Sequence, residues 1–174
     1  GPIGQLCVQM ARLSGAVPVI AVDPSGFRRD LASRLGADVV DVPGGDHHPH
    51  VVLELTARRD GLDDALAMVR PRGRVVLITA DANPYTVDLH GACFLKGINL
   101  TGVFAGGRGA DCQPGLWTED ADRQTFLDLA TSGRLDLDGI ITDRYPGRDA
   151  PAAYERLLAG DDTMVAALLD WDDD

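Results

Sequence analysis

Two glycines at the start of the chain have the spacing of a phosphate-binding turn. Gly1 and Gly4 stand three positions apart in "GPIG", which matches the last four positions of the pattern G-x-G-x-x-G. In that pattern Gly1 lets the backbone approach a pyrophosphate, and Gly4 lets the following helix pack closely on a strand. A helix that begins at Pro2 would direct its first N–H groups and the positive end of its dipole toward the phosphates.

An acid follows these glycines at the distance that a sugar contact requires. Asp23 closes the β-branched run "VPVIAVD" (17–23), about 20 residues after the glycines. Its carboxylate would accept hydrogen bonds from both hydroxyls of an adenosine ribose and would repel a 2′-phosphate, which favours NAD over NADP. Two other interpretations stay open. "GPIG" could be a simple turn or the remnant of a cleavage site, and a doubly wound methyltransferase also places an acid after its second strand.

Helices and strands alternate along the first part of the chain, which predicts a parallel sheet with helices on its faces. Apolar residues recur at helical spacing over 2–14, and Ser25 is placed to cap a second helix that ends near Gly36. The expected strands are 17–23, 38–42, 51–55, 74–79 and 99–105. We expect an α/β fold of the doubly wound (Rossmann) type. Because the glycine turn of that fold follows the central first strand, this sheet is expected to lack its first strand.

The alternation of elements changes after Gly106, and this change divides the chain. Residues 1–106 are expected to form a nucleotide-binding domain that is truncated at its N-terminus. Residues 107–174 predict a helix–strand–helix return, with helices at 119–132 and 150–159 and a strand between them. We expect this C-terminal segment to pack against another domain.

The composition limits the partners and the compartment. A net charge of −11 over 174 residues argues against nucleic acid and against an anionic membrane surface as partners. No apolar run approaches the roughly 20 residues that span a bilayer, and no signal peptide is visible. Cys7, Cys93 and Cys112 are far apart and odd in number, which indicates neither a disulfide framework nor a CxxC metal site. We therefore expect a cytoplasmic protein. The acidic, lysine-poor composition fits either a biased genome or adaptation to salt.

Two longer stretches resemble a known family. "DPSGFRRDLASRLGAD" (23–38) and "LATSGRLDLDGIITDRY" (129–145) are similar to the cofactor-binding part of zinc-dependent medium-chain dehydrogenases/reductases. Within this alcohol dehydrogenase-like family, the threonine and polyol dehydrogenase branch is the most similar. The resemblance covers essentially the whole chain but only the second part of a full-length member. It implies an oxidoreductase that passes hydride from a secondary alcohol, such as a polyol or a 3-hydroxy amino acid, to NAD.

The resemblance also implies roles for particular residues. Ile3 would lie beneath the pyrophosphate, and Asp23 and Arg28 would hold the adenosine ribose. Backbone segments at the ends of two strands would meet the nicotinamide carboxamide. These segments are Ile78, Thr79 and Ala80, and Val103 and Phe104. Ala57 stands where the family often has the glycine of E-x-x-G, which puts the packing near the nicotinamide in doubt. Glu54, inside an apolar strand, is interpreted as a structural acid that needs a partner.

No catalytic or metal-binding residue is expected within the chain. His47, His48 and His50 lie in a loop rich in glycine and proline, without a Cys or Glu at ligand spacing. The resemblance implies that a domain outside this chain supplies the zinc ligands and the proton relay, so 1–174 alone would bind NAD poorly and catalyse nothing. A non-catalytic nucleotide-binding module or degenerate paralogue is the alternative. Relatives usually pair through the last strand, here 99–105, which implies a homodimer or homotetramer.

Overall fold

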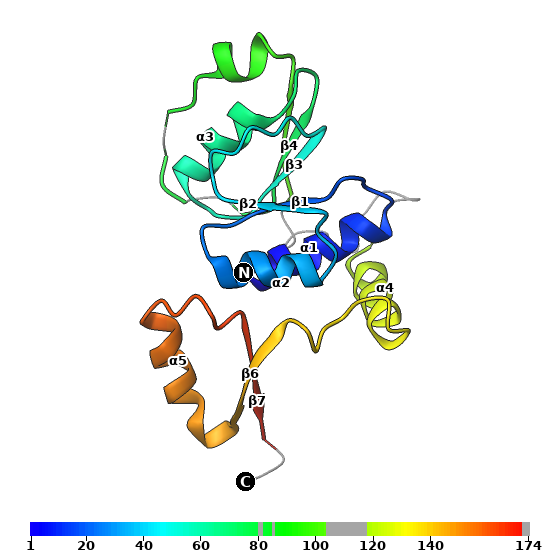
Figure 1. Cartoon of the computed structure of the whole chain (residues 1–174), viewed down its shortest axis with the longest axis vertical. Coiled ribbons are helices and arrows are strands. Elements are labelled where there is room, and N and C mark those ends of the chain that lie inside the picture. The colour runs from blue at the N-terminus through cyan, green and yellow to red at the C-terminus, as the bar shows by residue number, and fades with distance from the viewer. Residues whose placement is uncertain (80–81, 85, 104–117, 172–174) are drawn as a thin grey trace. The chain divides into compact units, whose positions relative to one another are not determined.

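The fold is described by a computed structural model that covers residues 1–79, 82–84, 86–103 and 118–171 (Figure 1). Contacts divide the chain into two compact units. The first joins Gly1–Val42 to Arg123–Asp174, and the second is Pro43–Asp122. The expected domains 1–106 and 107–174 are contiguous in sequence, and they stay a prediction.

The N-terminal part of the first unit is an α/β/α/β segment. Helix α1 (Pro2–Leu13) and helix α2 (Gly26–Arg34) alternate with strands β1 (Ile20–Val22) and β2 (Val39–Asp41). The two strands pair in parallel. Helical spacing places one apolar face of α1 and one of α2 on this pair. The buried residues of this core are Val8, Val19, Ala32 and Ala37. Strand β1 begins later than the expected residue 17 because Pro18 lacks the N–H group that a strand partner needs.

The C-terminal part of the first unit holds a second parallel pair. Strand β6 (Ile141–Pro146) leads through a short 3₁₀ turn, η2 (Gly147–Asp149), into helix α5 (Ala150–Leu158), and strand β7 (Ala166–Asp170) returns beside β6. Helix α4 (Glu119–Thr131) precedes this pair in the chain. The expected return is therefore present, and a final strand completes it.

The return packs on α1 and α2 of the same unit. Leu31 of α2 forms a buried cluster with Ile140 and Val165, and Leu6 of α1 packs against that cluster. This part of the C-terminal segment therefore buries apolar surface within the chain, although the sequence suggested only packing against another domain.

The second unit is a three-stranded parallel sheet with one long helix. Its elements are β3 (Val51–Glu54), α3 (Arg59–Met68), β4 (Arg74–Leu77), the π-helix η1 (Leu89–Phe94) and β5 (Asn99–Gly102). The strand order is β3-β4-β5. Apolar residues of α3 cover Val75 of β4, which is completely buried. The side chain of Lys96 donates hydrogen bonds to two carbonyls near the end of α3, those of Leu66 (2.7 Å) and Ala67 (2.8 Å).

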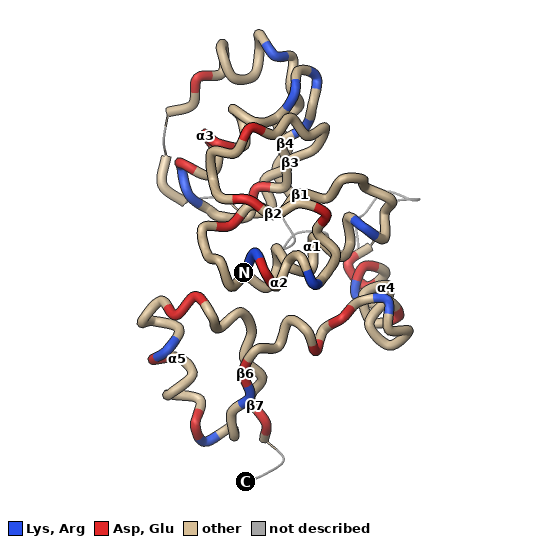
Figure 2. The backbone as a smooth tube through the Cα atoms, in the orientation of Figure 1, with Lys and Arg blue, Asp and Glu red and all other residues tan. Residues whose placement is uncertain are grey.

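The strand orders confirm the expected fold class. Strands β1 and β2 form one parallel sheet, and β3, β4 and β5 form another. Parallel strands joined by helices in each unit make an α/β fold, as the sequence predicts. Acidic residues occur on elements of both units, so the negative charge is not confined to one segment (Figure 2). No helix in the described ranges is long and apolar enough to cross a membrane.

Candidate functional site

The structure brings Gly1 and Asp23 together at the start of α1. The nitrogen of Gly1 lies 3.8 Å from Oδ2 of Asp23, which is the first residue after β1. Local geometry fixes the acid, because its Oδ1 accepts a 2.9 Å hydrogen bond from the backbone N–H of Ser25. The Ser25 hydroxyl in turn caps α2, as the sequence predicts, by accepting from the N–H of Arg28.

The first turn of α1 is open toward this acid. Gly1 is the N-cap and has no side chain with which to cap the helix, and a Cβ at this position would meet nothing within 4 Å. Pro2 supplies the first helical residue, and Ile3 is 51% exposed. Gly4 is half-buried in the same turn. The first N–H groups of α1 therefore have no side-chain cap, and such a helix N-terminus can bind an anionic group.

Arg28 is the third predicted residue at this end of the unit. Its backbone N–H donates to the Ser25 hydroxyl (3.3 Å), and its guanidinium is one of the charges near the nitrogen of Gly1. The carbonyl of Arg28 accepts a 3.0 Å hydrogen bond from Gln5 Nε2, which ties α2 to α1. Three residues that were predicted from separate parts of the sequence, Gly1, Asp23 and Arg28, therefore share one small region.

Sequence reasoning did not identify Gln5 as part of this region. Gln5 is buried, and its Oε1 has no hydrogen-bond partner within the part of the chain that the structure describes. A signal was present, because Gln5 and Gln9 lie four positions apart on a helix whose other inward residues are apolar. Two polar residues on the buried face of a helix require partners, and those partners belong to other segments.

The predicted nicotinamide segments lie in the second unit, at the carboxyl ends of its strands. Ile78 donates its N–H to the carbonyl of Glu54 (3.0 Å), and Val103 donates to the carbonyl of Leu77 (2.9 Å). The hydroxyl oxygen of Thr79 is buried and has no hydrogen-bond partner among the described residues. Ile78, Thr79 and Val103 therefore follow neighbouring strands at one edge of the sheet. Ala80 and Phe104 lie outside the described residues.

Glu54 has the partner that its burial demands. The residue is 5% exposed, and its Oε1 accepts hydrogen bonds from the N–H (2.7 Å) and the hydroxyl (2.5 Å) of Thr56. A Cβ on Gly61 would lie 2.9 Å from the same Oε1, so glycine is needed there for the turn into α3. Glu54 thus has the structural role that the sequence suggests.

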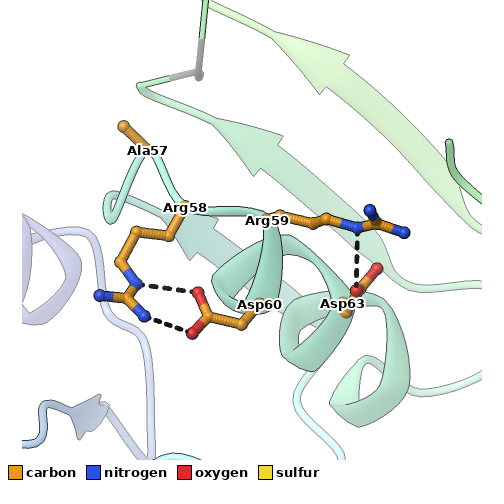
Figure 3. Close-up of a pocket in the computed structure, with 5 residues that line it drawn as sticks. All are labelled: Ala57, Arg58, Arg59, Asp60 and Asp63. Carbon is orange, nitrogen blue, oxygen red and sulfur yellow. Dashed lines mark hydrogen bonds and ion pairs between the residues drawn. The ribbon is translucent and has the colours of Figure 1, made fainter. Parts of the chain in front are cut away.

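A hollow of 450 Å³ lies at the start of α3, beside the turn that contains Ala57 (Figure 3). Arg58 forms two hydrogen bonds with Asp60 (2.9 and 2.6 Å), and Arg59 lies 3.9 Å from Asp63. The bond from Arg58 lowers the pKa of Asp60 to about 2. Each arginine that lines the hollow is thus neutralised by an aspartate, and none of the predicted site residues lines it.

The histidine loop does not form a metal centre in the described structure. Nε2 of His48 lies 3.3 Å from Oδ1 of Asp46. Among the described residues no group of three His, Cys, Asp or Glu side chains is arranged to hold a metal ion.

Burial raises the pKa of the Cys7 thiol, which keeps this residue protonated inside α1.

Comparison with known proteins identifies the family to which the chain is similar. Residues 2–120 match the family model described as zinc-binding dehydrogenase. L-threonine 3-dehydrogenase from Pyrococcus horikoshii is 34% identical over 183 aligned positions, which cover 97% of this chain and 49% of that protein. The enzyme from Thermococcus kodakarensis is 34% identical over 174 positions, which cover 92% and 46%. The chain thus spans about half the length of the curated relatives it matches.

Solved structures agree on the fold. L-idonate 5-dehydrogenase from Escherichia coli superposes with a TM-score of 0.79 at 23% identity, over 98% of this chain and 48% of that one. A short chain alcohol dehydrogenase from E. coli CFT073 in complex with NADH gives 0.79 at 17%, over 98% and 50%. A zinc-binding dehydrogenase from Sinorhizobium meliloti bound to NADP gives 0.72 at 22%, over 88% and 45%. The sequence match over more than half of the chain and the shared fold lead to one assignment: the chain belongs to the zinc-binding dehydrogenase family, of which it represents the C-terminal part.

Proposed function

We propose that this chain is the NAD-binding part of a dehydrogenase that oxidises a secondary alcohol. The observation that carries the proposal is the 3.8 Å approach of Gly1 to Oδ2 of Asp23 at the open end of α1. It places the glycine turn that would meet a phosphate beside the acid that would meet a ribose. Family membership removes the methyltransferase alternative.

The residues of α1 fit a pyrophosphate. A Cβ at Gly1 would occupy the space in front of the helix, so the absence of a side chain leaves room for the ligand. The N–H groups of Ile3 and Gly4 belong to the first turn of the helix, where backbone donors lack intrahelical acceptors. In this proposal they donate to the phosphates, and the exposed side chain of Ile3 packs beneath them.

Asp23 decides between the two nicotinamide cofactors in this proposal. Solved relatives carry NADH in one case and NADP in another, so family membership alone leaves the choice open. The side chain of Asp23 is 23% exposed, and its Oδ1 already accepts a hydrogen bond from the N–H of Ser25. The second oxygen, Oδ2, would accept from the ribose hydroxyls and would repel a 2′-phosphate. Arg28 would contact the same ribose.

Ile78, Thr79 and Val103 would contact the nicotinamide end of the cofactor. Ile78 and Val103 follow the carboxyl ends of β4 and β5, and their backbone groups would meet the carboxamide. The hydroxyl of Thr79, which has no partner among the described residues, would gain a hydrogen bond there, and this would remove the cost of a buried polar atom. When bound, the nicotinamide ring supplies the site that accepts or returns hydride.

The described residues do not fit a catalytic zinc, because they hold no group of three suitable ligands. We therefore assign the zinc ligands and the proton relay to the other half of a full-length protein, and we expect residues 1–174 alone to be inactive. The relatives named for threonine and idonate support a secondary alcohol, such as a polyol or a 3-hydroxy amino acid, as the substrate class.

Strand β5 supports a further part of the proposal, which is assembly into a homodimer or homotetramer. Among the described residues β5 is the last strand of its sheet and pairs with β4 on one side, and all its residues are exposed. A second copy that pairs along its other edge would continue the sheet across two subunits.

Fluorescence titration of the full-length protein with NADH and with NADPH tests the assignment. We expect NADH to bind at least about tenfold more tightly, which is about 1.4 kcal/mol. Asp23→Asn should reduce that preference, since it removes the charge that repels the 2′-phosphate. Asp30→Asn, which changes an exposed carboxylate on α2, is the matched control and should keep it.

Two results would decide against the proposal. Equal or tighter binding of NADPH by the unmodified protein would overturn the assignment of NAD. Tight binding of NADH without oxidation of any polyol or 3-hydroxy amino acid would indicate the non-catalytic module instead.

A further inference from the structure

A loop near the C-terminus contacts Arg28 across a long stretch of sequence. Nε of Arg28 donates a 3.2 Å hydrogen bond to the backbone carbonyl of Asp162. Asp162 lies between α5 and β7, in the segment 160–163, which we call the α5–β7 loop. The two residues belong to the same compact unit, so this contact does not depend on how the two units are placed.

The contact constrains a side chain that the proposed function assigns to the ribose. Arg28 is half-buried, and its N–H donates to the hydroxyl of Ser25, whose own N–H donates to Asp23. The nitrogen of Gly1 lies 3.8 Å from Asp23. A guanidinium has five N–H donors in one rigid plane, so fixing Nε fixes the plane in which the other nitrogens lie.

Asp161 and Thr163 hold the loop on either side of Asp162. Oδ1 of Asp161 accepts hydrogen bonds from the N–H (2.9 Å) and from the hydroxyl (2.6 Å) of Thr163. Oδ2 of Asp161 accepts a 2.6 Å hydrogen bond from Nε of Arg156 in α5. The peptide of Asp162 is therefore held between two residues whose side chains are bonded to each other.

Arg156 connects this loop to the strand pair. Its guanidinium bonds to Asp143 and Tyr145 of β6 as well as to Asp161, and it donates a 3.1 Å hydrogen bond to the hydroxyl of Thr163. Bonds from Thr163 and Arg156 lower the pKa of Asp161 to about 2, so its carboxylate stays ionised at neutral pH.

Packing against α2 secures the same region. Val165, two residues after Thr163, is buried with Leu31 of α2 and with Ile140. Arg28 and Leu31 are three positions apart on α2, which places them on neighbouring parts of one helical face. Helix α2 is therefore joined to the loop by a hydrogen bond and to Val165, just after the loop, by an apolar cluster.

We propose that the α5–β7 loop is a positioning element for the adenosine end of the cofactor site. Asp161 and Thr163 are its positioning residues: they hold the carbonyl of Asp162 so that it orients the guanidinium of Arg28 toward the ribose. This inference rests on the proposed function, and it adds residues from the far end of the chain to the NAD site.

Thr163→Val and Thr163→Ser form a matched pair that tests the loop in the full-length protein. Valine removes the hydroxyl that joins Asp161 and Arg156, whereas serine keeps it. We expect Thr163→Val to raise the Kd for NADH and for ADP-ribose by about fivefold, which corresponds to about 1 kcal/mol, and to raise the KM for NAD far more than it changes kcat. Thr163→Ser should bind like the unmodified protein.

A double-mutant cycle separates positioning from a general loss of packing. If the loop acts through Arg28, the effect of Thr163→Val on ADP-ribose binding should disappear when Arg28→Met is already present. A full additional loss in the Arg28→Met background would overturn the proposal. Asp138→Asn, which removes a carboxylate that pairs with Arg144 on the same segment, should leave binding unchanged.

The outcomes also distinguish this inference from the proposed function. If the unmodified protein fails to bind NADH and ADP-ribose, the proposed function itself fails. If it binds both and the valine and serine variants bind alike, only the positioning role is overturned. If Thr163→Val does not fold, Asp161→Asn provides the same comparison, because the amide keeps an acceptor for Thr163 but loses the charge that Arg156 needs.

Discussion

The side chain of Gln9 pairs with the backbone of Asp136, 127 positions later in the chain. Nε2 of Gln9 donates to the carbonyl of Asp136 (3.1 Å), and Oε1 accepts from its N–H (2.7 Å). Gln9 is 6% exposed, so both bonds are made away from bulk water. One side-chain amide thus attaches the C-terminal segment to α1 in the manner of a paired strand.

Replacing Gln9 with leucine should therefore destabilise the first unit. The substitution leaves the N–H and carbonyl of Asp136 without these partners, and we expect it to lower the free energy of unfolding by about 2 kcal/mol. Urea denaturation followed by circular dichroism measures the change. Gln124→Leu on exposed α4, where the amide donates to nearby Asp128, should have less than half the effect. Equal effects would show that the pair with Asp136 contributes nothing special.

Ala57→Gly should make the protein more stable. Ala57 has a φ of 55°, in the left-handed region that costs a residue with a Cβ about 1 kcal/mol or more. Glycine adopts this conformation without that cost, and we expect a gain of about 0.5–1 kcal/mol in thermal or chemical unfolding. Ala67→Gly, at an exposed position inside α3, should instead lose about 1 kcal/mol. A loss at Ala57 would mean that the turn relaxes in solution.

Gly147→Ala should change the environment of Trp171. A Cβ at Gly147 would overlap the indole ring, which lies over this glycine in the turn between β6 and α5. Trp171 is already 65% exposed, so we expect the displaced ring to move farther into solvent and its emission to shift slightly to longer wavelength. The measurement uses a Trp117→Phe background so that only Trp171 reports. Gly102→Ala, where a Cβ would meet nothing within 4 Å, should leave the spectrum unchanged. An unchanged spectrum in Gly147→Ala would show that the indole does not rest on this turn.

Asp161 should contribute to stability in a defined acidic range. Its pKa in the folded protein is about 2, below the ordinary value of 3.8, because Thr163 and Arg156 bond to the carboxylate. The contribution is complete above the ordinary value, and it is lost as the pH falls from there through the folded value. Acid unfolding followed by circular dichroism between about pH 5 and pH 2 should be less steep in Asp161→Asn. Asp30→Asn should follow the unmodified protein, and parallel curves for all three would contradict the assignment.

Much of the fold follows from local sequence patterns. Helical spacing predicted α1, α2, α4 and α5, and the hydroxyl of Ser25 caps α2 as expected. The π-helix at 89–94 was not predicted, because its hydrogen-bond register does not follow the periodicity of an α-helix. The strands are shorter than the apolar runs that predicted them, since apolar residues beyond a strand's end can still be buried by neighbouring elements.

The candidate site likewise contains residues that the sequence pattern predicted and contacts that it could not predict. Gly1 and Asp23 were identified from their types and spacing, and the structure places them together. The contact between Arg28 and Asp162 could not be identified in this way, because a backbone carbonyl is present at every residue and carries no sequence signal. Gln5 and Gln9 offered a partial signal as polar residues on a buried helix face, without naming their partners.

The sequence by itself determined the family, the parallel α/β architecture and the dinucleotide pattern at Gly1 and Asp23. These properties depend on periodicity and short-range spacing, which a linear chain records directly. Only the tertiary structure decided that the C-terminal return packs on α1 and α2, through Gln9 and Asp136 and through the cluster around Leu31. The reason is physical: contacts between residues more than a hundred positions apart are selected by the burial of apolar surface and by the demand that each buried polar group finds a partner, and both arise only when the chain is folded.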